Sequence, residues 1–235
     1  MPRVAVIAGV GPGLGESIAR KFAEEELHVA LLARTESYIE TLAEDLPTEA
    51  VAVPTDLADA EDIDAAFVAV QEELGPVDVL VNHASSAAWS GIRDGTAETY
   101  ERAWRVAARG GYATSAAVVD GMVERGEGTI LFTGATSAVR GRAGAAGFTS
   151  AKFAVRGLAQ SMAQELGPEG VQVSHVVIDG QIRTPTAVES SDREPETFLD
   201  PDDLAEVYWN LVEQDASTMT FEVHVTNGHQ ETEFL

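Results

Sequence analysis

The sequence predicts an α/β fold, a doubly wound parallel sheet of about seven strands with helices on both faces. Strand-like and helix-like segments alternate along all 235 residues, which favours parallel strands joined by helical crossovers. Several of the strand-like runs are continuously apolar, as strands buried on both faces are. No internal repeat, low-complexity tract or linker divides the chain, so residues 1–235 are expected to form one domain.

The elements follow from the pattern in chain order. The strands are apolar, β-branched runs, expected at 3–8, 28–33, 50–53, 77–81, 129–133, 171–178 and 219–225. The segments between them have helical periodicity, and helices are expected at about 13–26, 36–46, 59–74, 97–125, 148–167 and 201–214. The segment 180–200 is rich in polar residues and proline, which predicts a mobile loop or lid.

Ligands of an open parallel sheet bind beyond the carboxyl ends of its strands, where the strand order reverses. The first such position holds AGVGPGLG, in which Gly9, Gly13 and Gly15 lie between a strand and an amphipathic helix. Glycines at this spacing allow a tight turn and the close approach of a pyrophosphate, whose charge the helix N-terminus stabilises. The sequence therefore predicts that a dinucleotide binds here.

Composition excludes several classes of function. The chain has 39 acidic residues against 15 lysines and arginines, a formal net charge of −24, so neither nucleic acid nor an anionic membrane is expected as a partner. Scattered acidic residues with few lysines indicate a halophilic protein, adapted to high salt; an acidic protein of ordinary salt is the alternative. The absence of cysteine excludes disulfides, zinc–thiolate sites and cysteine nucleophiles, and no metal site is expected. With no long apolar run and no signal peptide, a cytoplasmic protein is expected.

Five landmarks give the chain a specific resemblance to the short-chain dehydrogenase/reductase family. After the glycine motif come TDL at 55–57, NHAS at 82–85, FTSAK at 148–152 and IDGQIRTP at 178–185, in the family's order along nearly the whole chain. The resemblance implies a Rossmann-type sheet, NAD(P)(H) binding, and a homodimer or homotetramer packed through helices 97–125 and 148–167. It also implies which residues hold the cofactor: Gly9, Gly13, Leu14, Gly15, Arg34, Asp56, Leu57, Asn82, Lys152 and Thr184.

The end of the second strand bears on which cofactor is used. Members of the family that prefer NAD carry an aspartate there for the ribose 2′-hydroxyl, whereas this chain has Arg34. A guanidinium can pair with the 2′-phosphate of NADP, and Thr35 and Ser37 offer further hydrogen bonds. The sequence therefore favours NADP(H) over NAD(H), although Arg34 could also be an ordinary solvated arginine.

The resemblance implies an active site built on an Asn-Ser-Tyr-Lys tetrad, and of these four residues this chain has only the lysine. Lys152 is at the position where the family's lysine holds the nicotinamide ribose and lowers the tyrosine pKa. The tyrosine position is Phe148, the serine position is Ala135 and the asparagine position is Ala107. Phenylalanine cannot exchange a proton, and losing such a group typically costs about 10²–10⁴-fold in rate. Phe148 is expected to fill the volume of the tyrosine and make the nicotinamide pocket more apolar.

Other residues are candidates for the missing proton donor, although each of these side chains is more often structural. They are Thr136, Ser137, Thr149, His83 and Tyr112, or a water held by Lys152. Arg140 and Arg142 flank the expected pocket and could attract an anionic substrate, or could be solvated loop charges. Two functions stay open: an oxidoreductase that transfers hydride between NADP(H) and a carbonyl or activated C=C group, and a non-catalytic NADP(H)-binding sensor or structural subunit.

Overall fold

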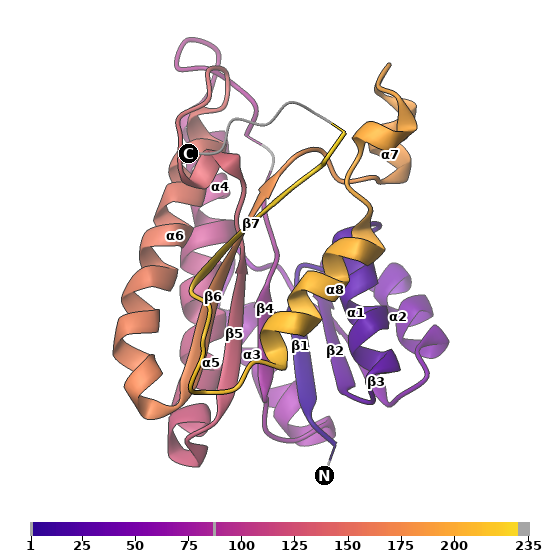
Figure 1. Cartoon of the computed structure of the whole chain (residues 1–235), viewed down its shortest axis with the longest axis vertical. Helices are drawn as coiled ribbons and strands as arrows, with labels where there is room; N and C mark the ends of the chain where they lie inside the picture. The colour runs from indigo at the N-terminus through magenta and orange to yellow at the C-terminus, as the bar shows by residue number, and fades with distance from the viewer. Residues whose placement is uncertain (1, 87, 230–235) are drawn as a thin grey trace.

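The computed structural model describes residues 2–86 and 88–229. Within these residues, a seven-stranded sheet has the order β3-β2-β1-β4-β5-β6-β7, and every neighbouring pair is parallel (Figure 1). The predicted α/β fold is therefore confirmed, and the order reverses between β1 and β4, where a ligand crevice is expected. The strands are β1 (Val4–Ala8), β2 (His28–Ala33), β3 (Ala50–Pro54), β4 (Val79–Asn82), β5 (Gly128–Thr133), β6 (Val171–Asp179) and β7 (Glu222–Thr226).

Helices cover both faces of the sheet (Figure 1). One face carries α1 (Leu14–Glu24), α2 (Glu36–Asp45) and α8 (Pro201–Val212). The other carries α3 (Ala60–Glu73), α4 (Ala97–Trp104), α5 (Gly110–Arg125) and α6 (Ala146–Leu166). Shorter elements are α7 (Pro185–Glu189) and the 3-10 turns η2 (Thr136–Ala138), η3 (Gly167–Glu169) and η4 (Pro195–Thr197). None of the helices in the described residues is both long and apolar enough to cross a membrane.

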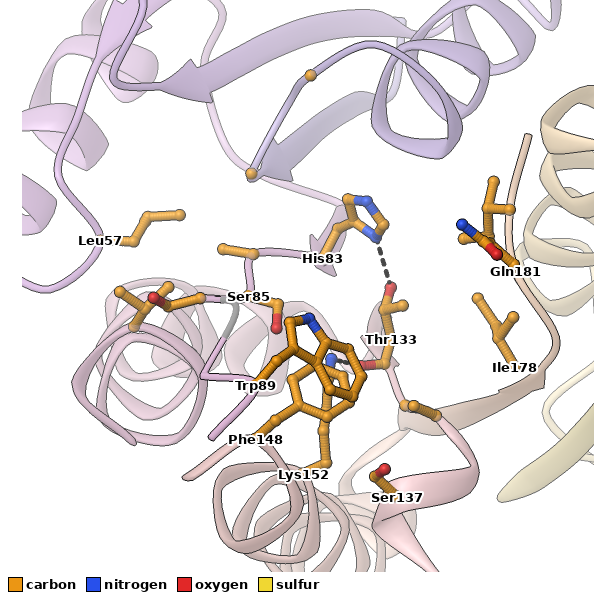
Figure 2. Close-up of a pocket in the computed structure, with 18 of the residues that line it drawn as sticks. Leu57, His83, Ser85, Trp89, Thr133, Ser137, Phe148, Lys152, Ile178 and Gln181 are labelled. Carbon is orange, nitrogen blue, oxygen red and sulfur yellow. Dashed lines mark hydrogen bonds between the residues drawn. The ribbon is translucent and has the colours of Figure 1, made fainter. Parts of the chain in front are cut away.

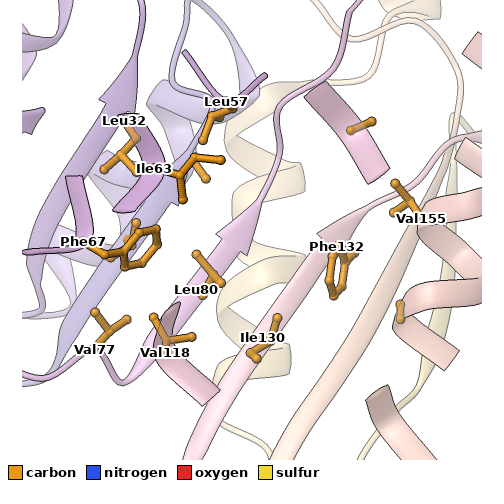
Figure 3. Close-up of a cluster of buried hydrophobic side chains, with 14 of the residues drawn as sticks. Leu32, Leu57, Ile63, Phe67, Val77, Leu80, Val118, Ile130, Phe132 and Val155 are labelled. Carbon is orange, nitrogen blue, oxygen red and sulfur yellow. The ribbon is translucent and has the colours of Figure 1, made fainter. Parts of the chain in front are cut away.

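The two cores follow from the alternation of side chains along the strands. Ala5 and Ile7 of β1 pack toward α1, α2 and α8, whereas Val4, Val6 and Ala8 pack toward the opposite helical layer. Burying one large apolar side chain stabilises the fold by about 1.5–3 kcal/mol. Because many such side chains are buried on both faces, the sheet holds the loops at its carboxyl edge in fixed positions. Figure 3 shows part of the second core: Leu32, Leu57, Ile63, Phe67, Val77, Leu80, Val118, Ile130, Phe132 and Val155.

The helical segment predicted at about 97–125 is found with those bounds, and it contains a π turn that the sequence did not predict. α4 ends at Trp104, a π-helical segment η1 (Arg105–Arg109) follows, and α5 begins at Gly110. A Cβ at Gly110 would lie only 2.5 Å from the Leu57 carbonyl oxygen, so this helix passes unusually close to the loop after β3. A π segment adds a residue to the turn and shifts the helix relative to its neighbours, which an amphipathic pattern does not reveal.

The segment 180–200 is more ordered than the predicted loop. α7 and η4 form within it, and Ile182 pairs with Leu199 in an isolated parallel bridge. Thr184 caps α7, because its Oγ1 accepts a hydrogen bond from the Ala187 N–H at 3.1 Å, and Pro185 follows in the first helical turn. The Thr-Pro pair is a helix-start signal that the overall polarity of the segment conceals.

Candidate active site

A cavity of about 1170 Å³ opens at the carboxyl ends of the strands, where their order reverses (Figure 2). Its walls come from the loops that follow β1 to β6 and from the first turns of α6. The predicted cofactor-binding and tetrad residues that line it are Gly9, Arg34, Asp56, Leu57, Ala135, Phe148 and Lys152, and the proton-donor candidates His83, Thr136 and Ser137 line it as well. The cavity therefore reaches from the end of β2 to the start of α6.

Gly9 shapes the turn after β1. Its φ is +111°, and a Cβ there would lie 2.5 Å from the Ala84 backbone nitrogen in the loop after β4. Only glycine fits this position without strain, and it lets the two loops meet at the cavity wall. The N-terminus of α1 follows at Leu14, and its N-cap residue Gly13 gives it no side-chain hydrogen bond. An uncapped helix start beside a glycine turn suits a phosphate group.

Several other predicted residues lie outside the cavity lining. Gly13 and Thr184 contact each other, because a Cβ on Gly13 would lie 2.7 Å from the Thr184 Cγ2. Asn82 is buried: its Nδ2 donates to the Ser115 Oγ at 3.2 Å, and its Oδ1 accepts from the Thr114 Oγ1 at 2.6 Å. These bonds tie β4 to α5, so Asn82 fixes the start of the cavity loop from behind. The predicted residues outside the lining are Gly13, Leu14, Gly15, Asn82, Ala107 and Thr184.

The end of the cavity after β2 and β3 is charged. Asp56 accepts hydrogen bonds from the Arg102 Nη2 at 3.2 and 3.1 Å and from the Ala58 N–H at 3.0 Å. Burial tends to raise the pKa of Asp56, but these hydrogen bonds outweigh burial and hold that pKa below its usual value. Arg34 is exposed at this end, and the described residues offer its guanidinium no hydrogen-bond or ion-pair partner. This end therefore presents a cation that a ligand anion can pair with.

Lys152 lies at the opposite end, with only 3% of its surface exposed. Its Nζ donates a hydrogen bond to the Thr133 carbonyl oxygen at 2.7 Å (Figure 2). Burial disfavours the charged form and lowers the pKa of Lys152 to about 8. The ammonium is thus held in place by one backbone acceptor, and it releases its proton more readily than an exposed lysine does.

The phenylalanine beside this lysine is part of an aromatic column, Arg142–Trp89–Phe148–Lys152. The rings of Trp89 and Phe148 stack with centroids 4.6 Å apart and planes 29° apart (Figure 2). The Arg142 guanidinium carbon is 5.3 Å from the Trp89 ring centroid, and the Lys152 Nζ is 5.7 Å from the Phe148 ring centroid. Cations near ring faces are attracted by the ring quadrupole, so the column joins a buried cation to one at the surface.

His83 starts a chain of polar side chains beside the lysine. Its Nδ1 lies 3.1 Å from the Thr133 Oγ1 (Figure 2). The Thr133 Oγ1 lies in turn 2.7 Å from the Tyr208 hydroxyl. Burial, and to a smaller extent the charge of Lys152, lowers the pKa of His83 to about 4. His83 is therefore neutral at neutral pH and is a poor source of protons there.

The remaining candidate proton donors divide by position. Thr136 and Ser137 line the cavity, but the Thr136 Oγ1 donates to Asp179 at 2.6 Å. Tyr112 is 62% exposed on α5, and neither it nor Thr149 belongs to the lining. Among the hydroxyl groups of the predicted set, Ser137 is thus the one at the cavity without a recorded acceptor in the described residues.

Comparison with known proteins decides the family. The sequence profile of short chain dehydrogenases matches residues 3–195, from β1 to the segment after α7. The chain belongs to this family. An uncharacterised oxidoreductase of Staphylococcus aureus strain N315 is 29% identical to this short-chain dehydrogenase over 208 residues, which cover 87% of this chain and 88% of the relative.

Solved members of the family share the fold closely. An alcohol dehydrogenase of the archaeon Thermococcus sibiricus, complexed with 5-hydroxy-NADP, superposes with a TM-score of 0.90 at 26% identity, over 100% of both chains. A metagenomic short-chain oxidoreductase in complex with NADP superposes with a TM-score of 0.84 at 26% identity, over 95% of this chain and 96% of that chain. The seven-stranded parallel sheet with helices on both faces is therefore the fold of a short-chain dehydrogenase.

The four positions that the resemblance assigns to the tetrad lie in different surroundings in this short-chain dehydrogenase. Ala135 has extended backbone before η2 and lines the cavity, as do Phe148 and Lys152. Ala107 is buried within the π segment and does not. The three replacements are all apolar, so the lysine is the one group at these positions that carries an exchangeable side-chain proton.

Sequence reasoning missed three residues of the cavity. Trp89 lies in the loop after β4, Arg102 on α4 reaches Asp56, and Arg193 lies between α7 and η4. A lone tryptophan in the small-residue stretch ASSAAWS was a usable signal, because aromatic side chains commonly line ligand pockets. Nothing in the spacing of Arg102 or Arg193 distinguishes them from solvated charges.

Proposed function

We propose that the protein is an NADP(H)-dependent oxidoreductase acting on a carbonyl or activated C=C group of a small molecule. When bound, NADPH supplies a hydride, with its two electrons, to a substrate carbon. The π electrons of the reduced bond move to the neighbouring oxygen or carbon, which takes up one proton, so the products are the reduced substrate and NADP⁺. The chain's own task is to bind both molecules and to hold that proton.

The residues at the cavity suit NADP(H). The Gly9 turn and the start of α1 would hold the pyrophosphate, and Arg34 would pair with the 2′-phosphate. Lys152 would bind the hydroxyls of the nicotinamide ribose at the other end of the cavity. The NADP and 5-hydroxy-NADP in two solved relatives support the same choice. A carboxylate at position 34 would repel a 2′-phosphate, whereas the guanidinium of Arg34 attracts it.

Lys152 is the observation on which the enzymatic assignment depends. One of its three N–H donors is used by the Thr133 carbonyl, so two are left for ligand groups. A general acid works best when its pKa is near the working pH, and burial brings the pKa of Lys152 to about 8. We therefore assign the substrate's proton to Lys152, which takes over the task that Phe148 cannot perform.

The test separates binding from turnover. NADPH and NADH are titrated first, and NADPH oxidation is then followed with aldehydes, ketones, quinones and enones in molar salt. We expect NADPH to bind more tightly than NADH and at least one substrate class to be reduced. Tight NADPH binding without turnover across the panel would support the non-catalytic sensor or subunit instead. Tighter binding of NADH would contradict the role of Arg34.

We also propose a homodimer or homotetramer packed through the helices at 97–125 and 148–167. Four large apolar side chains on these helices are exposed: Tyr100 (49%), Trp104 (43%), Tyr112 (62%) and Phe153 (45%). Exposed apolar groups gathered on neighbouring helices favour an interface between subunits. Light scattering on the Tyr112→Glu, Phe153→Glu double variant should give a smaller particle than the wild type, with unchanged far-UV circular dichroism. An unchanged mass would contradict this interface.

A further inference from the structure

We propose that the substrate end of the cavity selects a planar carbonyl compound that carries a carboxylate, with its ring against Trp89 and its carboxylate on Arg142 and Arg193. This inference rests on the proposed function and adds the substrate class to it. The reaction would be that of an aryl 2-oxo acid: hydride goes to the ketone carbon, a proton goes to the ketone oxygen, and the 2-hydroxy acid and NADP⁺ form.

The distribution of charge points to an anionic ligand. The chain is strongly acidic, with 39 acidic residues against 15 basic ones. Yet within residues 2–86 and 88–229 the cavity is lined by six basic side chains and two acidic ones: Arg34, Arg102, Arg140, Arg142, Lys152 and Arg193 against Asp56 and Asp179. A cavity lined by one sign of charge concentrates ligands of the other sign.

The two cavity carboxylates do not cancel this excess. Asp56 is bound by Arg102 at the end assigned to the adenine half of the cofactor. Asp179 accepts the Thr136 hydroxyl at 2.6 Å and keeps its negative charge. The two carboxylates thus offset only two of the six basic side chains, and the lining of the cavity keeps an excess of positive charge.

Arg142 and Arg193 come from different segments and meet the same cavity. Arg142 precedes α6, and Arg193 lies between α7 and η4; both side chains are exposed. The described residues give the Arg193 guanidinium no hydrogen-bond partner, whereas its neighbour Arg183 in the same segment is paired with Asp200. Arg142 contacts only the Trp89 ring among them. Two guanidinium groups without acceptors suit a carboxylate, which can take bidentate hydrogen bonds.

Trp89 is the residue that would select a ligand with a planar ring. The indole is 56% exposed although its ring stacks on Phe148, which is a large apolar surface to leave in water beside a cavity. Offset stacking of aromatic rings is worth a further 0.5–1.5 kcal/mol in general. A conjugated ring packed against Trp89 lies next to Arg142, so ring and carboxylate are recognised together.

The experiment compares an acid with its neutral ester. Phenylglyoxylate and methyl phenylglyoxylate carry the same ketone and ring and differ in charge. Their Kd values are measured by calorimetry on the NADP⁺-loaded protein, and their kcat/KM values from NADPH oxidation at one fixed salt concentration. In the wild type the Kd of the acid should be lower than that of the ester by about tenfold or more, because hydrogen bonds between charged groups are strong.

Three variants locate the preference. Arg142→Ala should weaken binding of the acid by roughly tenfold and leave the ester within about twofold. Trp89→Ala should weaken both by about three- to tenfold, since stacking does not depend on charge. Arg3→Ala is the matched control: Arg3 lies 5.3 Å from the Trp209 ring centroid, outside the cavity, and its loss removes the same charge and the same kind of contact. It should change neither Kd.

The outcomes distinguish this inference from the proposed function. Equal affinity for acid and ester, or an acid preference that survives Arg142→Ala, would overturn the substrate class. Selective binding of the acid without NADPH oxidation by any ketone would keep the ligand class and reject the oxidoreductase function. Loss of both preferences in Arg3→Ala would show that net charge alone is responsible, which also overturns the inference.

Discussion

The two ends of the cavity differ in the polarity of the side chains that line them. At the end after β2 and β3, Arg34, Asp56 and Arg102 form a charged site, and the Gly9 turn keeps its left-handed backbone. At the end near α6, positions 135 and 148, where the family resemblance implies serine and tyrosine, hold the apolar residues Ala135 and Phe148, and Lys152 lies beside them. In our proposal, binding the nucleotide and donating a proton are therefore separable tasks, because the first needs no tyrosine and Lys152 contributes to both.

Replacing Lys152 tests that conclusion with the largest expected effect. Lys152→Met should remove the ribose contact and the proton source together, so we expect a loss of about 10²–10⁴-fold in kcat/KM and weaker NADPH binding. Lys21→Met is the matched control, because Lys21 is the other lysine of the chain and pairs with Glu25 and Glu206 on the far side of α1. A Lys152→Met protein that binds NADPH as the wild type does would contradict the account.

Restoring the lost groups removes the difference between the two ends. Phe148→Tyr combined with Ala135→Ser supplies a hydroxyl acid and a carbonyl-orienting hydroxyl beside Lys152, and should raise ketone reduction by about 10²-fold. Steady-state NADPH oxidation measures it, with NADPH affinity as the control that should stay constant. A double variant no faster than the wild type would indicate that the Trp89–Phe148 stack has moved the substrate away from these positions.

Changing Arg34 tests the charged end after β2 and β3 alone. Arg34→Ala should weaken NADPH binding by roughly tenfold or more and leave NADH nearly unchanged, because only NADPH has the 2′-phosphate. Arg105→Ala is the control: Arg105 is paired with Glu101 at 2.7 Å and does not line the cavity. An equal loss for both cofactors would show that Arg34 acts on the loop structure and not on the phosphate.

The pH dependence of stability tests the burial of Lys152 without any ligand. The pKa of Lys152 is about 8 in the folded protein against 10.5 in the unfolded chain, so between these values the unfolded chain binds more protons and stability rises with pH. The rise should be about 3 kcal/mol over this window and vanish below pH 8, where both states hold the proton. Denaturant titrations of the cofactor-free protein measure this rise. The free energy of unfolding of Lys152→Met should not rise with pH in this window, whereas that of Lys21→Met should.

The sheet was predictable because its signals are local and strong. Continuously apolar runs such as 28–33 mark strands buried on both faces, and that strand is found with the predicted bounds. The π segment at Arg105–Arg109 was not predictable from the pattern, and neither was the close approach beside it of Gly110 to Leu57, a residue far away in the sequence. The periodicity of a sequence reports on residues that are close along the chain, whereas this contact joins residues that come together only in the folded protein.

The candidate site shows the same limit. Motif spacing identified Phe148, Lys152 and Gly9, whose positions relative to a strand or helix are fixed. Trp89 and Arg193 lie in loops whose paths depend on the packing of several elements. Motif spacing therefore could not predict that these two residues line the cavity. The Arg102–Asp56 pair joins residues 46 positions apart, and a single sequence gives no reason to pair them.

The pH profile of hydride transfer tests the central claim most directly. If Lys152 supplies the substrate's proton, kcat/KM for the reduction of a substrate by NADPH should be constant at neutral pH. It should fall above about pH 8, as the ammonium deprotonates. In Lys152→Arg, whose guanidinium stays protonated, any residual rate should lose this alkaline fall. A wild-type profile that is flat through pH 8 to 10, or a fall that remains unchanged in Lys152→Arg, would contradict the assignment of the proton to this lysine.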